Sequence, residues 1–169
     1  MGDDLSQLLG VVALAATDRV RGAVDATLGR GGAHAAALIH LKAYPGEPVG
    51  SLAPVLRISQ PAAVKLADRL VSDGLAVRDP GPDGRTRALR LTPAGADAAD
   101  RALADRAARL DELVAVLDTG ERRQLLPLLE KLVAGLADDR PGALNTCRMC
   151  DRAACCGRPA GCPLQHTVR

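Results

Sequence analysis

The stretch Ile58–Gly95 reads ISQPAAVKLADRLVSDGLAVRDPGPDGRTRALRLTPAG, and its hydrophobic period changes twice. Ser59 stands at a helix N-cap position, a proline follows in the first turn and Gly74 closes the segment, which predicts a helix. LAVRD and ALRLT alternate like strands, and the Asp-Gly pair between them is typical of a hairpin. Pro93 then opens another helix. The order of these elements predicts a winged helix-turn-helix.

Helical periodicity continues on both sides of this stretch. Apolar residues recur at three- and four-residue steps, GRGG ends the first such run, and Asp118 with Glu121 has the spacing of a capping box. We read DDRPG, at 138–142, as a linker. The further helices are expected from Asp4 to about Leu28, His34 to Tyr44, Ser51 to Arg57, Pro93 to about Leu117, and Asp118 to about Ala137.

The composition is that of a globular chain with few large side chains. Hydrophobic residues make up 47% of 169 and charged residues 25%, but Tyr44 is the only aromatic residue. A core of Leu, Val, Ile and Ala buries less area per residue, so self-association is expected. No apolar run is long enough to cross a bilayer, and the N-terminus is acidic, so we expect a cytoplasmic protein without structural disulfides.

Positive charge is concentrated in two segments. Between Arg57 and Arg90, seven Lys/Arg face four Asp, a balance of +3; between Arg140 and Arg169, five Arg face one Asp, a balance of +4. The whole chain carries +2, so the remainder carries −5. This pattern favours nucleic-acid binding. There is no nucleotide-binding glycine pattern, nucleophile elbow or paired-carboxylate site, so the sequence does not predict an enzyme.

The predicted second helix of the helix-turn-helix has a face suited to the DNA major groove. Gln60 can pair with adenine edges and Lys65 with guanine or phosphate, while Val64, Leu66 and Leu70 are expected to dock on the core. The hairpin tip suits minor-groove or phosphate contact. The expected DNA-binding residues are Ser59, Gln60, Pro61, Ala62, Ala63, Lys65, Arg69, Asp83, Arg85 and Arg87.

The same stretch resembles the MarR (multiple-antibiotic-resistance regulator) family of bacterial repressors. The resemblance rests on ADRLVSDGL and on the D-x-R…L-T-P-A-G signature that joins wing to helix. It implies a mainly α fold with a small β-hairpin wing, in which the winged helix-turn-helix lies inside a helical dimerisation frame. It also implies a homodimer that binds a palindromic double-stranded DNA operator as a repressor, and that releases the operator when a small-molecule ligand or an oxidant acts.

The resemblance also assigns segments and residues. It implies a MarR-type domain over 1–139, with a DNA-binding lobe at about 33–92 and dimerisation helices at about 4–29 and 93–138. Asp83 and Arg85 correspond to the family's wing pair, in which the arginine enters the minor groove. Lys65 stands where the family usually has Arg, and Val64 where Ser is common.

All five cysteines lie in the segment 140–169, within CRMCDRAACCGRPAGC. Their spacings suit a four-thiolate zinc site or an iron–sulfur cluster, and zinc is slightly preferred because nothing in the sequence demands electron transfer. C-x2-C-x5-C is similar to the cysteine core of WhiB-like iron–sulfur regulators, and the C-R-x-C-D start resembles the tails of some MarR relatives. A metal-free thiol switch and a thiol redox enzyme remain alternatives. The candidate ligands are Cys147, Cys150, Cys155, Cys156 and Cys162, with Cys155 and Cys156 competing for one place.

The three histidines are weaker candidates. His34 and His40 are six residues apart on one helix and are expected at the surface or at the edge of the core. His166 follows the cysteines and could serve as a reserve metal ligand.

Overall fold

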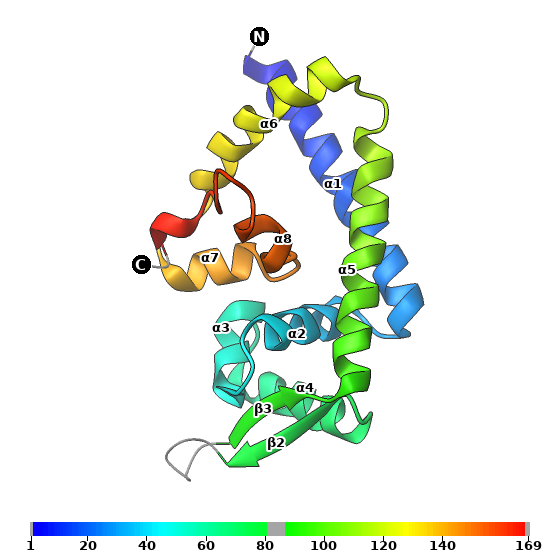
Figure 1. The fold of residues 1–169 in the computed structure, drawn as a ribbon, viewed down its shortest axis with the longest axis vertical. Coiled ribbons are helices and arrows are strands. Elements are labelled where there is room, and N and C mark those ends of the chain that lie inside the picture. The colour runs from blue at the N-terminus through cyan, green and yellow to red at the C-terminus, as the bar shows by residue number, and fades with distance from the viewer. Residues whose placement is uncertain (1, 81–86, 168–169) are drawn as a thin grey trace.

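The computed structural model describes residues 2–80 and 87–167, with side chains from Asp4 onward. Figure 1 shows an elongated molecule with a lobe at one end, long helices rising from it, and the C-terminal segment held between the two. The helices are α1 (Gly2–Leu28), α2 (Gly32–Ala43), η1 (Val49–Ser51), α3 (Leu52–Leu56), α4 (Gln60–Ser72), α5 (Pro93–Val114), α6 (Thr119–Ala134), α7 (Arg140–Thr146), α8 (Arg152–Cys156) and η2 (Gln165–Thr167). The mainly α fold with a small wing is therefore confirmed.

A small antiparallel sheet closes the lobe. The strands β2 (Ala76–Pro80) and β3 (Arg87–Leu91) form the predicted hairpin, and β1 (Glu47–Pro48) pairs with the other side of β3. The sequence did not predict β1, because a two-residue strand that contains a proline has no periodicity of its own.

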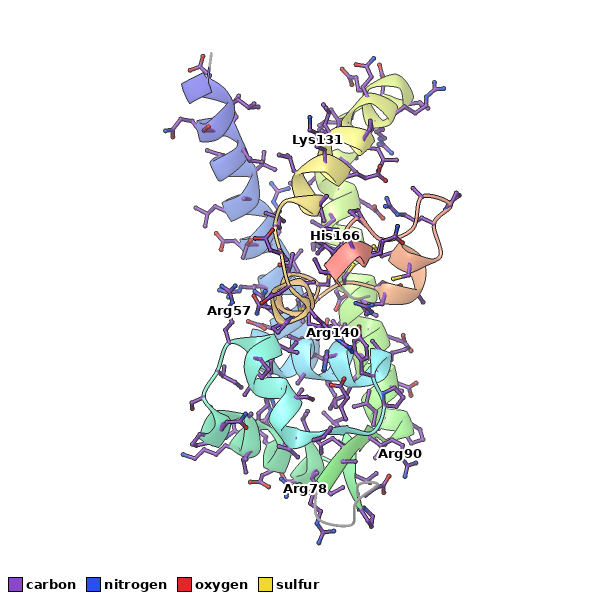
Figure 2. The ribbon with its side chains drawn as sticks, turned by 90° about the vertical axis from the view of Figure 1, so that its left-hand side faces the viewer. Arg57, Arg78, Arg90, Lys131, Arg140 and His166 are labelled. Atoms are coloured by element: carbon purple, nitrogen blue, oxygen red, sulfur yellow. The ribbon has the colours of Figure 1, made fainter. Side chains whose placement is uncertain are left out.

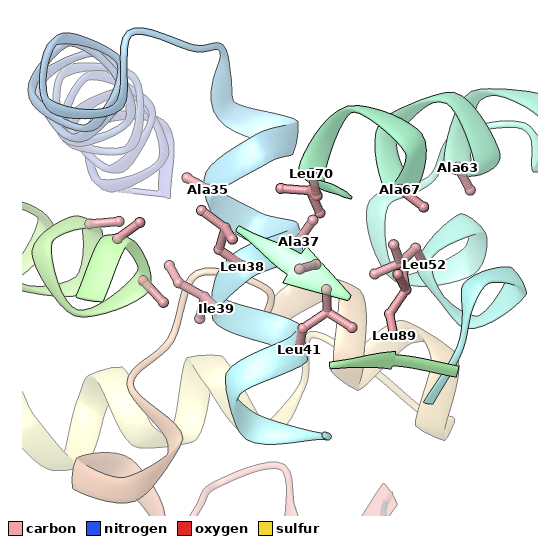
Figure 3. Close-up of a cluster of buried hydrophobic side chains, with 14 of the residues drawn as sticks. Ala35, Ala37, Leu38, Ile39, Leu41, Leu52, Ala63, Ala67, Leu70 and Leu89 are labelled. Atoms are coloured by element: carbon pink, nitrogen blue, oxygen red, sulfur yellow. The ribbon is translucent and has the colours of Figure 1, made fainter. Parts of the chain in front are cut away.

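The core of the lobe is made of leucines and alanines. Leu38 and Leu41 of α2 pack with Leu52 of α3, Leu70 of α4 and Leu89 of β3, and all five are buried (Figure 3). Small residues line the places where helices meet, which allows close approach without aromatic side chains. The predicted aliphatic core is confirmed.

The long helices follow the predicted order, with small differences at their ends. α1 packs along α5, and Gly29, with φ of 62°, ends α1 in the left-handed conformation that glycine favours. α5 ends at Val114 and α6 at Ala134, each three residues earlier than predicted. The capping box of Asp118 and Glu121 at the start of α6 is present as predicted. No helix in the described part of the chain is both long and apolar enough to cross a membrane.

The prediction of a linker at 138–142 was wrong. Asp139 caps α7, because its Oδ1 accepts a hydrogen bond from the Gly142 amide at 2.8 Å, and Pro141 occupies the first turn. α7 packs against α3, where the buried Asn145 donates from Nδ2 to the Val55 carbonyl at 2.6 Å. Ala137, Ala143 and Leu164 form a second small core with α6. The C-terminal segment is thus folded onto the rest of the chain.

The histidines of α2 lie deeper than expected, since both are buried. His40 Nε2 lies 2.8 Å from a Glu47 carboxylate oxygen. His34 Nε2 lies 3.7 Å from Asp73 and makes no hydrogen bond with any described residue. Burial lowers the pKa of His34, and it outweighs the opposing effect of the Asp73 charge. His34 is therefore neutral in the folded protein at pH 7.

This neutral histidine should make the protein less stable in mild acid. As pH falls below about 6.5, the unfolded chain takes up a proton at His34 that the folded chain does not, so the free energy of unfolding falls. The free energy of unfolding stops falling below the lowered pKa of His34 in the folded state, because both states then carry the proton. Urea denaturation at pH 7.5, 6.5 and 5.5 should show a shallower decline for His34→Asn than for the wild type. Equal slopes would contradict a neutral buried His34.

Candidate nucleic-acid interface and cysteine cluster

α4 presents a polar strip at the outer end of the lobe. Ser59 caps the helix, and its Oγ accepts a hydrogen bond from the Ala62 amide at 3.3 Å. Gln60, Pro61, Lys65 and Arg69 are exposed, and Ala62 is partly exposed. A capped helix with exposed polar residues in its first turns has the form needed to enter a major groove.

Two residues of α4 face opposite ways from their predicted directions. Ala63, expected in the polar strip, is fully buried against the core together with Ala67 and Leu70 (Figure 3). Val64, expected on the core, is 44% exposed beside Lys65. The spacing of four and then three residues places Ala63, Ala67 and Leu70 on one face, and the small alanines let α4 approach its neighbours closely.

The turn before α4 holds two features that bear on the strip. The Gln60 side-chain amide donates to the Gly50 carbonyl at 3.3 Å, so it has to turn away from Gly50 to pair with a base edge. Arg57, between α3 and α4, has φ of 51° and is exposed. Figure 2 shows it at the side of the lobe. The sequence-based site omitted Arg57, although its charge contributes to the basic segment.

The hairpin adds further basic side chains at the same end of the molecule. Arg78 and Arg90 lie on the lobe in Figure 2, but they form ion pairs with Asp68, at 2.7 Å, and Asp79. Arg87 is exposed at the start of β3. Among the residues that the structure describes, no ion pair with an acidic group is formed by Arg57, Lys65, Arg69 or Arg87, so these cations are left for phosphates. Two predicted wing residues, Asp83 and Arg85, lie outside the described residues.

Comparison with solved structures identifies this arrangement. Apo MarR from E. coli is 25% identical, with a TM-score of 0.63 over 76% of this chain and 96% of the other. A MarR-family transcriptional regulator from Silicibacter pomeroyi is 28% identical, with a TM-score of 0.58 over 77% and 88%. The chain has the MarR-type winged-helix fold. MepR, a transcription regulator of the Staphylococcus aureus multidrug efflux pump MepA, is 19% identical with a TM-score of 0.68 over 78% and 98%.

No protein-family model matches the chain, and no curated protein sequence matches it. The three MarR-type structures are covered almost completely, whereas each leaves a part of this chain without a counterpart. The predicted resemblance is therefore confirmed at the level of the fold. Between 22% and 24% of this chain has no counterpart in these three structures.

Four of the five cysteines come together beside the long helices of the MarR-type fold. Cys147, Cys150, Cys155 and Cys162 all line one cleft of about 660 Å³ between the C-terminal segment, α5 and α6. Cys150 follows Cys147 across a turn in which its amide donates to the Cys147 carbonyl at 2.8 Å. Cys156 does not line this cleft and is exposed. Cys156 instead lines a smaller pocket of about 100 Å³, together with Cys147 and Cys162.

The thiols interact directly with one another. A hydrogen bond with Cys150 lowers the pKa of the Cys147 thiol, and the same bond, followed by burial, raises the pKa of Cys150. Burial raises the pKa of Cys155 to about 12, and hydrogen bonds with Cys150 and Cys162 add to this. Cys150 Sγ also donates to the Asp151 carbonyl at 3.8 Å. Among the described residues, however, no three or more Cys, His, Asp or Glu side chains are arranged to hold a metal ion.

Three arginines of the C-terminal segment have different partners in this region. Arg152 lies near Cys147 and stacks over the Tyr44 ring, 5.0 Å from its centroid. Arg148 instead donates to the Asn145 carbonyl, and Arg158 pairs with Glu130 of α6 at 3.0 Å.

Two contributors to this region were missed in the sequence. Arg106 of α5 lines the cleft with Cys150, and its positive charge partly offsets the rise in the pKa of that thiol. Asn145 anchors α7 to α3. Neither residue belongs to a motif, so only the folded chain reveals its part. His166 is exposed, and its Nδ1 lies 3.2 Å from the Pro163 carbonyl. It does not line the cleft that holds the four thiols.

Proposed function

We propose that the protein is a homodimeric transcriptional repressor that binds a palindromic operator, and that its cysteine-rich segment responds to a metal or to oxidation. The observation that carries the DNA-binding part is the exposed strip of α4 beside a hairpin whose Arg87 is exposed. Gln60 and Lys65 would reach base edges or phosphates, while Arg69 and Arg87 would contact the DNA backbone. E. coli MarR and MepR, which share the fold, support this assignment.

Exposed apolar residues on the long helices support the homodimer. On α1, Leu5, Leu8, Leu9 and Val12 form a stripe at three- and four-residue steps, and Leu8 is 64% exposed. On α6, Leu128, Leu129 and Leu132 do the same, Leu132 is 52% exposed, and the exposed Leu136 follows just beyond the end of the helix. Soluble single chains rarely expose stripes of this size, so a second copy is the simplest cover. A dimer would also provide two copies of α4 for the two half-sites of a palindrome.

Selection of binding sequences from fragments of the source genome tests this function. The expected result is enrichment of one inverted repeat, bound much more tightly than a scrambled fragment of equal length at physiological salt. Binding that is equally tight on all fragments and disappears with added salt would leave only non-specific attraction. A reporter gene placed behind the selected repeat distinguishes repression from activation, because a repressor lowers reporter expression and an activator raises it.

The Lys65→Ala variant should weaken operator binding by about 10-fold or more, because each dimer loses two cationic contacts. If Lys65 contacts only phosphate, the loss is similar on all sequences, and the slope of log K against log salt becomes shallower. If Lys65 reads guanine, discrimination falls at one position of each half-site. Lys131→Ala is the matched control, since Lys131 lies on α6 far from the lobe (Figure 2). Equal binding by both variants would remove Lys65 from the interface.

A further inference from the structure

We propose that Cys147, Cys150, Cys155 and Cys162 form a four-thiolate zinc site that holds α7 against the helix-turn-helix, and that Cys156 takes no part in it. The four thiols line one cleft, although they come from a turn, a short helix and a returning loop. Thiolate sulfur is a preferred ligand of zinc, and a site with four protein ligands is the structural kind.

The returning loop explains how Cys162 reaches the others. Gly161 has φ of 70°, a left-handed conformation, and its amide donates to the Arg158 carbonyl at 2.9 Å. The Arg158 guanidinium donates back to the Gly161 carbonyl at 3.0 Å and also pairs with Glu130 of α6. These bonds fix the loop so that Cys162 lines the same cleft as Cys155. The fourth ligand is thus placed by contacts that do not themselves need a metal.

A single zinc ion suits these four thiols better than an iron–sulfur cluster. Tetrahedral coordination with zinc–sulfur bonds of about 2.3 Å gathers four thiolates from one short segment onto one ion. Cys150 follows Cys147 across one turn, and Cys147 and Cys162 pack against the same small core. Nothing in the sequence demands the electron transfer that an iron–sulfur cluster would supply.

Nearby cations suit the charge of such a centre. Four thiolates with Zn²⁺ carry a net charge of −2 after the thiol protons have passed to water. Arg106 of α5 and Arg152 of α8 act on Cys150 and Cys147. A favourable positive charge next to thiolates also stabilises them in the bound form.

α7 connects this site to the DNA-binding lobe. Cys147 follows the last residue of α7, and its amide donates to the Ala143 carbonyl at 2.9 Å. Two residues earlier, the buried Asn145 is bonded to the Val55 carbonyl of α3, the helix that precedes α4. Zinc binding at Cys147 should therefore reduce fraying of α7 and keep Asn145 on α3. The consequence for operator binding rests on the function proposed above, whereas zinc binding and the ordering of α7 do not.

Metal analysis of the full-length protein, purified without oxygen, is the first test. The expected result is one zinc per chain and a colourless solution. After removal of zinc by a chelator, added Co²⁺ should give the strong visible bands of tetrahedral cobalt bound to thiolates. Iron with sulfide and a brown colour would overturn the zinc assignment. A protein that binds neither zinc nor cobalt, and instead forms disulfides, would overturn the site.

Single Cys→Ser variants then identify the ligands. Replacing Cys147, Cys150, Cys155 or Cys162 should lower zinc affinity by at least about 100-fold, because each removes one of four bonds. Cys156→Ser is the matched control and should bind zinc like the wild type. Circular dichroism confirms that each variant is folded. Loss of zinc in Cys156→Ser together with retention in Cys155→Ser would overturn the ligand set.

Hydrogen exchange tests the connection to the lobe without any DNA. Zinc should slow amide exchange in α7 and α3 of the wild type by about 10-fold or more and leave the distant N-terminal half of α1 unchanged. Asn145→Ala should keep the effect in α7 and lose it in α3. An effect of zinc that stays confined to the segment 147–162 would overturn the connection between the site and the helix-turn-helix.

Discussion

Replacing Gly95 with alanine should lower the free energy of unfolding by about 3 kcal/mol, since overpacking of a tight contact has costs of this order. A Cβ at this position would lie 1.9 Å from the Leu75 carbonyl oxygen, which is backbone and cannot rotate away. The same carbonyl accepts a hydrogen bond from the Thr92 amide at 3.0 Å, and this contact joins the start of β2 to the start of α5. Urea denaturation of the purified variant measures the change.

Gly22→Ala provides the matched control for this prediction. Gly22 lies within α1, and nothing comes within 4 Å of a Cβ built on it. Alanine is the better helix former, so this variant should be unchanged or more stable by up to about 1 kcal/mol. If Gly95→Ala proved as stable as the wild type, the close approach of α5 to Leu75 would be wrong. The glycine of the L-T-P-A-G signature is therefore explained by packing rather than by a contact with DNA.

The second large effect is expected from charges placed on the long helices. Leu8→Glu or Leu132→Glu should raise the dissociation constant of the dimer by at least about 1,000-fold. Twofold symmetry puts each new carboxylate into the interface twice, and burying an unpaired charge costs several kcal/mol per ion. Light scattering after size-exclusion chromatography, over a range of protein concentrations, measures the change. Operator affinity should fall in parallel, since a monomer reads one half-site.

Gln7→Glu is the control for the dimer. Gln7 is exposed on the opposite side of α1 from the Leu5–Leu8–Val12 stripe, so it adds the same charge without entering the proposed interface. It should leave the dimer intact. If Leu8→Glu and Leu132→Glu behaved like Gln7→Glu, the exposed stripes would not be the dimer interface.

Some of these features could be predicted from local sequence because the forces that specify them act over a few residues. Ser59, Asp118 and Asp139 are all caps whose bonds reach three residues along the chain, and two of them were recognised. Asp139 was missed because the proline and glycine after it favoured a linker reading. Pro141 in fact occupies the first turn of α7, where a proline needs no amide partner.

The faces of α4 were less predictable. Hydrophobicity alone favoured Val64 over Ala63 as a core residue, and the structure has them reversed. The space between α4, α3 and β2 is narrow, so small residues are required there and valine is left at the surface. A residue's size relative to its neighbours decides such a position, and those neighbours are distant in sequence.

By itself the sequence determined the order of the helices from α1 to α6, the hairpin and the aliphatic core, because periodicity, caps and turns act locally, and its resemblance to the MarR family indicated the fold. Only the tertiary structure decided that Cys155 rather than Cys156 shares one cleft with the other three thiols, that Arg106 lines this cleft, and that Asn145 joins α7 to Val55. Each of these depends on which side of one element meets another. That choice is made by packing between segments up to 90 residues apart, which no local pattern records.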